Sequence, residues 1–440
     1  MNDAAEAAAR LRQGYAVYGL AVLIVAYVLA FIDRQILSLL VEPLKRDLHL
    51  SDVQISFLQG LSFALFFSLG GLPIGRLADT RRRTRVLAVG VAAWSVMTGL
   101  CGLARSFGLL LVCRIGVGVG EASMTPSAYS LIGDTFRGRR LGVAMGFYGI
   151  GPYLGSGLAL VLGGLVIRRL PPLLHLPGLG VIHGWQAIFL ALGPIGLIVA
   201  LWIASLREPP RSGLEPQAPP AWPVVWSYFK WNAAAVVSVD LAVTFAAMAM
   251  YSLSAWGPSF LVRTYQLKVA DAGQALGWQV MVFGSAGALA AGVIGDALRR
   301  RGWSFGRLAV MIAAALCAAP LAALTMLCGS EILSRTLFGP LVLLMTLAIG
   351  SGPATLQEIT PSRMRGVQHA LAVLIGNLLG LGLGPTIVAV TTDVGFHDET
   401  KVGLALAVTL PAMLSTSVLA GLASLAPYRR SLAAAPEEAR

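Results

Sequence analysis

Charged residues are scarce in this chain. Asp, Glu, Lys and Arg make up 12% of its 440 residues, whereas a soluble domain carries about 25%, so the composition excludes an ordinary soluble domain. Cysteine is also rare. The four cysteines lie in apolar runs without CxxC spacing, which excludes a disulfide framework and a thiolate zinc site. They are Cys101, Cys113, Cys317 and Cys328.

Signals of enzyme chemistry are missing as well. The five histidines form no HExxH pattern and no cluster with other ligand-type residues, so we expect no metal site. The stretch GVGVGEAS, residues 116–123, follows no predicted strand and lies within an apolar run, which argues against a phosphate-binding loop. With no nucleophile or cofactor motif, we predict that the chain is not an enzyme and has no cofactor.

Long apolar runs dominate instead, and 56% of the residues are hydrophobic. About 20 apolar residues cross the hydrocarbon core of a bilayer as a helix. Twelve such runs predict an all-α polytopic membrane protein. They cover 15–40, 53–75, 86–104, 107–131, 141–167, 184–206, 229–260, 272–297, 307–328, 333–357, 366–391 and 402–427.

The net charge of +12 could suggest nucleic acid, but Lys and Arg also collect in the cytoplasmic loops of membrane proteins. With both termini inside, 21 Lys and Arg residues fall in inner segments and 9 in outer ones. We therefore predict cytoplasmic N and C termini and no nucleic-acid partner.

The two halves of the chain repeat each other. GRLADTRRRTR, which begins at Gly75, is echoed 217 residues later by GVIGDALRRR from Gly292. FRGRR (136–140) and RMRGV (363–367) share an Arg-Gly pair offset by 228 residues. Three ordered echoes, the third being a Gly-Pro in the fifth and eleventh runs, predict a duplicated six-helix unit. We assign bundles to 1–206 and 229–440, joined by a proline-rich cytoplasmic linker at 207–228.

Four charged residues interrupt the runs of the first half. Asp33 and Arg34 are adjacent, so their side chains point about 100° apart, and we expect one to face a cavity and the other a neighbouring helix. Arg114 should lie at a similar depth, with Glu121 seven residues further on the same helix face. Ionisable residues inside a bilayer pair with one another and mark ion or substrate routes. A purely structural ion-pair role is the alternative interpretation.

Other charges are candidates of a second rank. Asp240, in the seventh run, could be a coupling acid, a cavity dipole or a residue near the surface. Five residues at the inner ends of the runs are expected to form a cytoplasmic gate. They are Asp79, Arg83, Asp296, Arg300 and Glu358.

The Gly-x-x-x-Asp-x-Arg-Arg-Arg loop, its second copy and RIGVGVGEASMTPSA (114–128) resemble the signature motifs of the major facilitator superfamily over essentially the whole chain. The resemblance implies two pseudo-symmetric six-helix bundles that expose a central site to each side of the membrane in turn. FIDRQILS (31–38) together with the fourth-run motif is similar to the spinster-type branch, which is associated with export of lysolipids and sphingosine-1-phosphate.

By this resemblance, Asp33 and Glu121 are the proton-coupling acids, Arg114 is the partner of Glu121, and Arg34, the other substrate or charge-pair arginine, neighbours the outer gate. We predict a monomeric, proton-coupled or proton-gated transporter of an amphipathic anion or lipid in a bacterial inner membrane. A sugar-acid or organic-anion symporter is an alternative, because such transporters also carry an Asp-Arg pair late in the first span. A hydrophobic-drug/proton antiporter is another.

Overall fold

The computed structural model describes residues 2–171, 173–178, 180–211 and 222–434. Twelve helices in these ranges are long and apolar enough to cross a membrane, which confirms the predicted fold class. The first half contains these elements: α1 (Asn2–Leu39), α2 (Val41–Leu48), α3 (Asp52–Ser56), η1 (Phe57–Leu61), α4 (Ser62–Thr80), α5 (Arg83–Cys101), α6 (Phe107–Glu121), α7 (Met124–Thr135), α8 (Arg139–Gly149), α9 (Gly151–Arg169), β1 (Leu173–Leu176), β2 (Gly180–His183) and α10 (Gly184–Ala204).

The second half begins with one long helix, α11. Its elements are α11 (Trp222–Tyr265), α12 (Val269–Gln279), η2 (Val280–Gly284), α13 (Ser285–Arg300), α14 (Gly306–Leu327), α15 (Glu331–Ile359), η3 (Ser362–Met364), α16 (Arg365–Ile375), η4 (Gly376–Leu383), α17 (Gly384–Val390), η5 (Thr391–Gly395), η6 (Glu399–Lys401) and α18 (Val402–Ala434). The segments η1, η2, η4 and η5 are π-helical, whereas η3 and η6 are 3₁₀ turns.

Local sequence explains several boundaries. The side chain of Ser51 accepts a hydrogen bond from the backbone of Gln54, and the Gln54 side chain accepts one from the backbone of Ser51, so a capping box starts α3. α11 begins at Trp222, seven residues before the predicted start of the second bundle, because a proline such as Pro223 is tolerated in the first turn of a helix. The predicted linker residues 212–221 lie outside the described residues.

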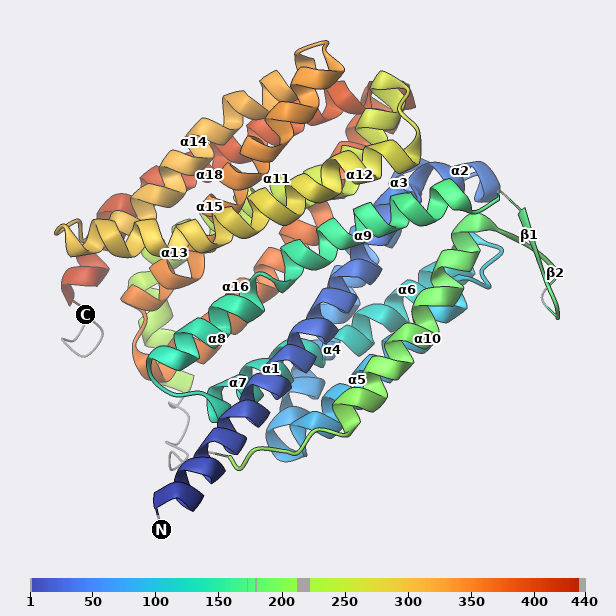
Figure 1. Ribbon diagram of the computed structural model, residues 1–440. Helices are drawn as coiled ribbons and strands as arrows, with labels where there is room; N and C mark the ends of the chain where they lie inside the picture. The colour runs from blue at the N-terminus through green and yellow to red at the C-terminus, as the bar shows by residue number, and fades with distance from the viewer. Residues whose placement is uncertain (1, 172, 179, 212–221, 435–440) are drawn as a thin grey trace.

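A short antiparallel hairpin of β1 and β2 joins α9 to α10. It was not predicted, because four residues per strand give no pattern that stands out between two apolar runs. In Figure 1 the hairpin projects from one end of the helices, and the chain termini lie toward the other. We call these the hairpin end and the terminus end.

The two halves meet along matching helices. Within the first half α1 packs against α9, and α5 against α10; within the second, α11 and α14 pack against α18. Between the halves, α9 packs against α12 and η2, while α4 packs against η4. A Cβ added to Gly157 would lie 2.6 Å from the carbonyl oxygen of Gly277, and one added to Gly277 would lie 2.7 Å from that of Gly157. Only glycine permits backbones to approach this closely.

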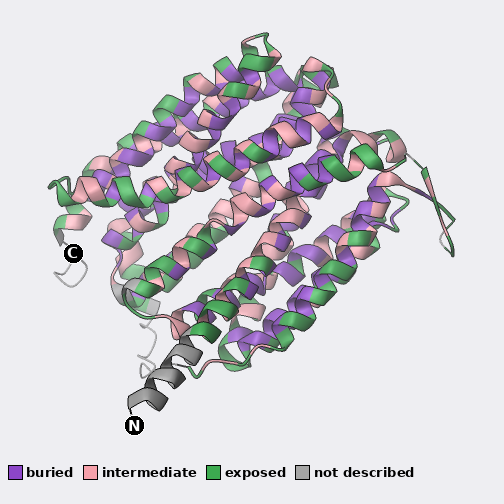
Figure 2. Ribbon diagram, in the orientation of Figure 1, coloured by how far each residue is buried: buried purple, intermediate pink, exposed green. Residues whose placement is uncertain are grey.

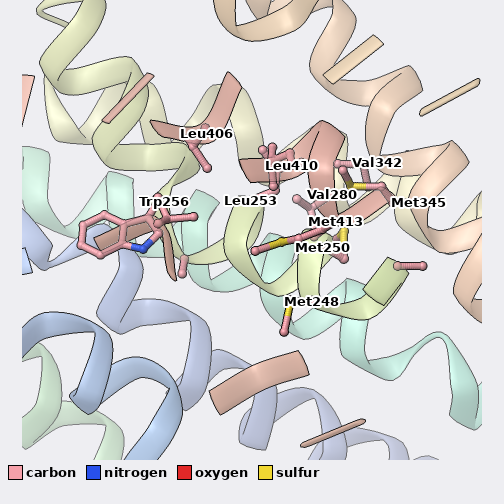
Figure 3. Packing of buried hydrophobic residues seen from close by; sticks show 14 of the residues in the cluster. Met248, Met250, Leu253, Trp256, Val280, Val342, Met345, Leu406, Leu410 and Met413 are labelled. Atoms are coloured by element: carbon pink, nitrogen blue, oxygen red, sulfur yellow. The ribbon is translucent and has the colours of Figure 1, made fainter. Parts of the chain in front are cut away.

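Apolar side chains both fill the core and cover the outside. In the second half Met248, Met250, Leu410 and Met413 gather with other buried side chains of the same cluster (Figure 3). Exposed residues follow the outer faces of the helices in Figure 2, and large apolar side chains are among them, for example Leu201 at 72% exposure and Ile332 at 78%. An apolar outer surface of this extent suits lipid rather than water.

Candidate functional site

The adjacent residues Asp33 and Arg34 face different neighbours, as predicted from their positions on one helix. Asp33 is buried between α5 and α6, where its Oδ2 accepts a hydrogen bond from the Thr98 hydroxyl. Its Oδ1 lies 3.7 Å from Nη1 of Arg114. Arg34 turns instead toward a cavity between the halves. Asp33 is therefore enclosed by neighbouring helices, whereas Arg34 is accessible to a ligand in the cavity.

Arg34 makes the central ion pair of the first half. Its Nε donates to Oε2 of Glu121 at 2.6 Å, and Glu121 is fully buried. The guanidinium carbon lies 4.3, 4.9 and 5.1 Å from the ring centroids of Phe63, Phe31 and Phe67. An arginine with aromatic rings at these distances gains cation–π attraction in addition to the ion pair.

The partner predicted for Glu121 was wrong. Arg114 lies beside Asp33, and its Nε donates to the Leu58 carbonyl at 3.4 Å. Seven residues along a helix give a separation of about 10 Å, which leaves Arg114 pointing across to α1 rather than along α6. The predicted set of four charges does come together, as the pairs Asp33–Arg114 and Arg34–Glu121.

This charge cluster is under-satisfied. Asp33 Oδ1, both Nη atoms of Arg114 and Glu121 Oε1 are buried without a hydrogen-bond partner in the described part of the chain. A buried polar group that lacks such a partner costs roughly 1 to 3 kcal/mol. A change in the proton content or position of any member therefore alters the energy of the whole cluster.

The cavity between the halves has an empty volume of about 1090 Å³. Its wall combines Arg34 and a few polar groups with aromatic and apolar side chains from both halves. They include Tyr27, Phe31, Gln35, Gln59, Tyr153, Met250, Tyr251 and Leu381. A second cavity, of about 840 Å³, lies in the second half and shares Ala247, Tyr251 and Ile349 with the first. The two cavities therefore adjoin at these three residues.

Asp240 lies on the wall of this second cavity. Its Oδ2 accepts a hydrogen bond of 3.1 Å from Nε2 of Gln368, and the carboxylate is 6% exposed. Arg365 and His369 line the same cavity. The sequence singled out Asp240 but could not supply Gln368, which lies 128 residues away on α16.

Ion pairs join the halves at the hairpin end. Arg263 of α11 contacts Asp52 through both Nη atoms, at 2.6 and 2.9 Å, and Glu42 through Nε at 2.8 Å. Lys45 bonds Asp52 at 2.6 Å and also reaches Glu399. We call these five residues the latch. A further pair, Arg168 with Asp271, also crosses between the halves there.

The sequence did not indicate the latch. Its members lie at the ends of spans, where charges are ordinary, and the pairs that cross between the halves connect residues 211 or more positions apart. The only available signal is that Asp52 and Arg263 directly border apolar runs, which is also true of many topology-determining charges.

The predicted gate residues stay within their own halves. Arg83 pairs with Asp134 of the first half and with Glu208, at the start of the predicted linker. Glu358 pairs with Arg299 and Arg307 of the second half and accepts a hydrogen bond from Tyr428, while Asp296 pairs with Arg307. The backbone carbonyl of Asp79 accepts from Arg211. In the described part of the chain, the Arg300 side chain forms no hydrogen bond or ion pair. A role as a gate between the halves stays a prediction.

Glu208 is a gate-region residue that the sequence did not single out. Burial alone would raise the pKa of its carboxyl, but hydrogen bonds from the Arg83 and Thr84 side chains and backbone amides outweigh burial and hold the pKa below its usual value. Glu208 therefore stabilises the fold above its unfolded pKa of about 4.3, and this contribution is lost as the pH falls through the lower folded value.

We expect Glu208→Gln to lower the melting temperature of the purified protein at pH 7, because the amide cannot match the charge-assisted bonds to Arg83. The deficit should begin to shrink as the pH falls below about 4.3 and should vanish below the lower folded pKa, where the Glu208 carboxyl of the unmodified protein is neutral as well. Thermal unfolding between pH 7 and pH 3 measures this. Glu331→Gln, which removes one partner of an exposed pair with Arg335, is the control and should change little. A deficit that is equal at every pH would contradict the assignment.

The family model of the Major Facilitator Superfamily matches residues 23–385. The chain is therefore a member of this superfamily, whose fold and function are those of transporters rather than enzymes.

Three relatives illustrate the range of the family. An MFS-type efflux pump of Mycolicibacterium smegmatis is 26% identical, with 98% of this chain and 96% of the relative covered. Protein spinster homolog 1 of Xenopus tropicalis is 26% identical over 55% of this chain and 45% of its own length. The crystal structure of a bacterial homolog of the human lysosomal transporter Spinster, inward-facing and unoccupied, has a TM-score of 0.76 at 25% identity, covering 95% of this chain and 97% of that one.

Proposed function

We propose that this transporter moves an amphipathic anion, such as a lysophospholipid, by alternating access coupled to protons. The observation that carries the proposal is Arg34, a cation on the wall of the cavity between the halves, surrounded by three phenylalanines and paired with the buried Glu121. A phosphate or carboxylate headgroup needs a positive partner in a low-dielectric site. The apolar wall of the same cavity suits an acyl chain.

Coupling follows from competition for Arg34. An anionic headgroup that binds Arg34 displaces Glu121, which would then be a buried carboxylate without its partner. Uptake of a proton by Glu121 removes this cost, so proton and anion favour each other's binding, and the coupling is reciprocal. Asp33 and Arg114 form the neighbouring ion pair, whose energy changes when Glu121 takes up a proton or an anion binds Arg34. Asp33 is the second proton-coupling acid of the proposal.

The membrane orientation belongs to the same proposal. With the terminus end on the cytoplasmic side of a bacterial inner membrane, the latched hairpin end faces outward and the cavity is accessible from inside. The likeness to an inward-facing spinster homolog supports this view. The six-helix units at 1–206 and 229–440 would then rock about the cavity, and Asp79, Arg83, Asp296, Arg300 and Glu358 would approach one another when the terminus end closes. We propose that one chain suffices for this cycle.

The proposal is tested by binding of lysophosphatidylglycerol to purified protein at pH 6 and pH 8. We expect higher affinity at pH 6, by at most about a hundredfold, since uptake of one proton per lipid changes the affinity by up to a factor of ten, or about 1.4 kcal/mol, for each of the two pH units. Glu121→Gln should bind equally well at both values, because Arg34 is then free without a proton. Glu331→Gln, on the surface, should behave like the unmodified protein.

Two other outcomes would replace the proposal. Binding of galacturonate without binding of lysolipids would favour the sugar-acid symporter. Binding of a cationic apolar dye, with lysolipids excluded, would favour drug efflux, the candidate function supported by the full-length match to an efflux pump.

A further inference from the structure

Buried acids in the membrane-spanning region follow a pattern. Four of them have Arg or Lys partners: Asp33 with Arg114, Glu121 with Arg34, Asp52 with Arg263 and Lys45, and Glu358 with Arg299 and Arg307. Asp240 is the exception. Among the described residues its carboxylate has the Gln368 amide as its hydrogen-bond partner and no cation. A buried carboxylate without a countercharge is costly.

The vicinity of Asp240 offers hydrogen-bond acceptors. Asp240 accepts from Nε2 of Gln368, and because an ionised carboxylate can only accept, the orientation of the amide is determined. Gln368 Oε1 is then left without a donor in the described structure. Asn377 and Thr244, which also carry oxygen acceptors, line the same cavity. A group with several N–H donors and a positive charge matches this set.

We propose that the Asp240 cavity binds the primary ammonium group of a zwitterionic lipid headgroup. This inference rests on the proposed function and specifies its substrate class. A primary ammonium carries three donors, whereas a quaternary ammonium carries none and is recognised by aromatic cages. In the described part of the chain, Tyr251 is the one Phe, Tyr or Trp that lines this cavity. Arg365 lines the same cavity and supplies a cation for the phosphate beside the ammonium group.

The ammonium site is separate from Arg34. Asp240 and Tyr251 lie 11 residues apart on α11, which is about 16 Å along the helix. Tyr251 also borders the cavity between the halves, whose wall contains Arg34. A phosphoethanolamine headgroup is too short to reach both Arg34 and Asp240. A lipid whose ammonium group binds Asp240 therefore has its headgroup beside α11 and α16 (Figure 1), in a second position distinct from the one at Arg34.

Three lysolipids of equal chain length test this site at pH 7. They carry ethanolamine, choline or glycerol on the phosphate. In the unmodified protein we expect the ethanolamine lipid to bind about tenfold or more tightly than the other two, the usual range for a hydrogen bond to a charged group. Asp240→Asn should abolish this preference and leave binding of the glycerol lipid unchanged. Glu331→Gln is the matched acid-to-amide control in the same half.

The outcomes separate the two proposals. Equal affinity for all three lipids in the unmodified protein overturns the ammonium site but leaves lysolipid transport standing, and this comparison needs no substitution to fold. A preference that survives in Asp240→Asn also overturns it. If Asp240→Asn weakens the binding of all three lipids alike, Asp240 binds a proton rather than the ammonium group of a ligand. This outcome also rejects the inference. Binding of galacturonate alone rejects both proposals.

Discussion

Arg263→Ala is expected to open the hairpin end. The arginine is 9% exposed and makes a bidentate contact with the fully buried Asp52 as well as a bond to Glu42. Removal of one partner from a buried ion pair costs about 3 to 5 kcal/mol, although Lys45 still contacts Asp52 and keeps the effect toward the lower value. The ratio of open to closed forms should therefore rise about a hundredfold, at 1.4 kcal/mol per factor of ten.

Spin labels at His175 in the hairpin and at Ile332 on α15 measure this change, with Cys317 and Cys328 replaced by serine. The distance distribution should broaden and shift to longer values in Arg263→Ala. Arg335→Ala, which breaks an exposed pair at the same end, should leave the distribution unchanged. If Arg263→Ala gives the same distances as the unmodified protein, the latch does not hold the halves together.

The second large effect is expected for Arg34→Ala, which should weaken binding of lysophosphatidylglycerol by about a hundredfold or more. Truncation of a buried, hydrogen-bonded charge costs about 2 to 5 kcal/mol in binding. Part of any loss would be structural, because Glu121 would remain buried without the partner that now lies 2.6 Å away. Equilibrium binding to the purified variant gives the total.

The double variant Arg34→Ala/Glu121→Gln separates the two contributions. It removes both charges of the pair, so thermal stability should recover relative to Arg34→Ala. Binding of the lipid should stay weak, because the headgroup still lacks its cation. Recovery of binding together with stability would mean that Arg34 only neutralises Glu121.

The fold was predictable because a bilayer allows few arrangements of the backbone. Twelve apolar runs and a repeated loop leave few arrangements in a bilayer, where every backbone polar group must be bonded within its own helix. The β1–β2 hairpin and the early start of α11 at Trp222 were missed. Both lie outside the apolar core, where the bilayer imposes no such limit.

The sequence identified the charged residues of the site but did not show which of them contact one another. Asp33, Arg34, Arg114 and Glu121 were identified because an ionisable residue is conspicuous in an apolar run. Sequence spacing describes one helix at a time, so it placed Arg114 and Glu121 on one helix face without showing their partners. The family resemblance paired Arg114 with Glu121, whereas the contacts cross from α1 to α6. The same limit hid the partners of Asp240 and Asp52, which come from another helix of the same half and from the other half, respectively.

The π-helical segments have a consequence for motion. η1 and η2 begin 223 residues apart, at Phe57 and Val280, so the duplicated unit carries the same irregularity twice. Gln59 of η1, Val280 of η2 and Leu381 of η4 all border the central cavity. A π turn replaces the regular i to i+4 backbone bonding with i to i+5 bonding and is often found at functional sites. Three spans therefore interrupt their α-helical bonding at the level of the cavity wall, which is where we expect them to bend when the cavity changes shape.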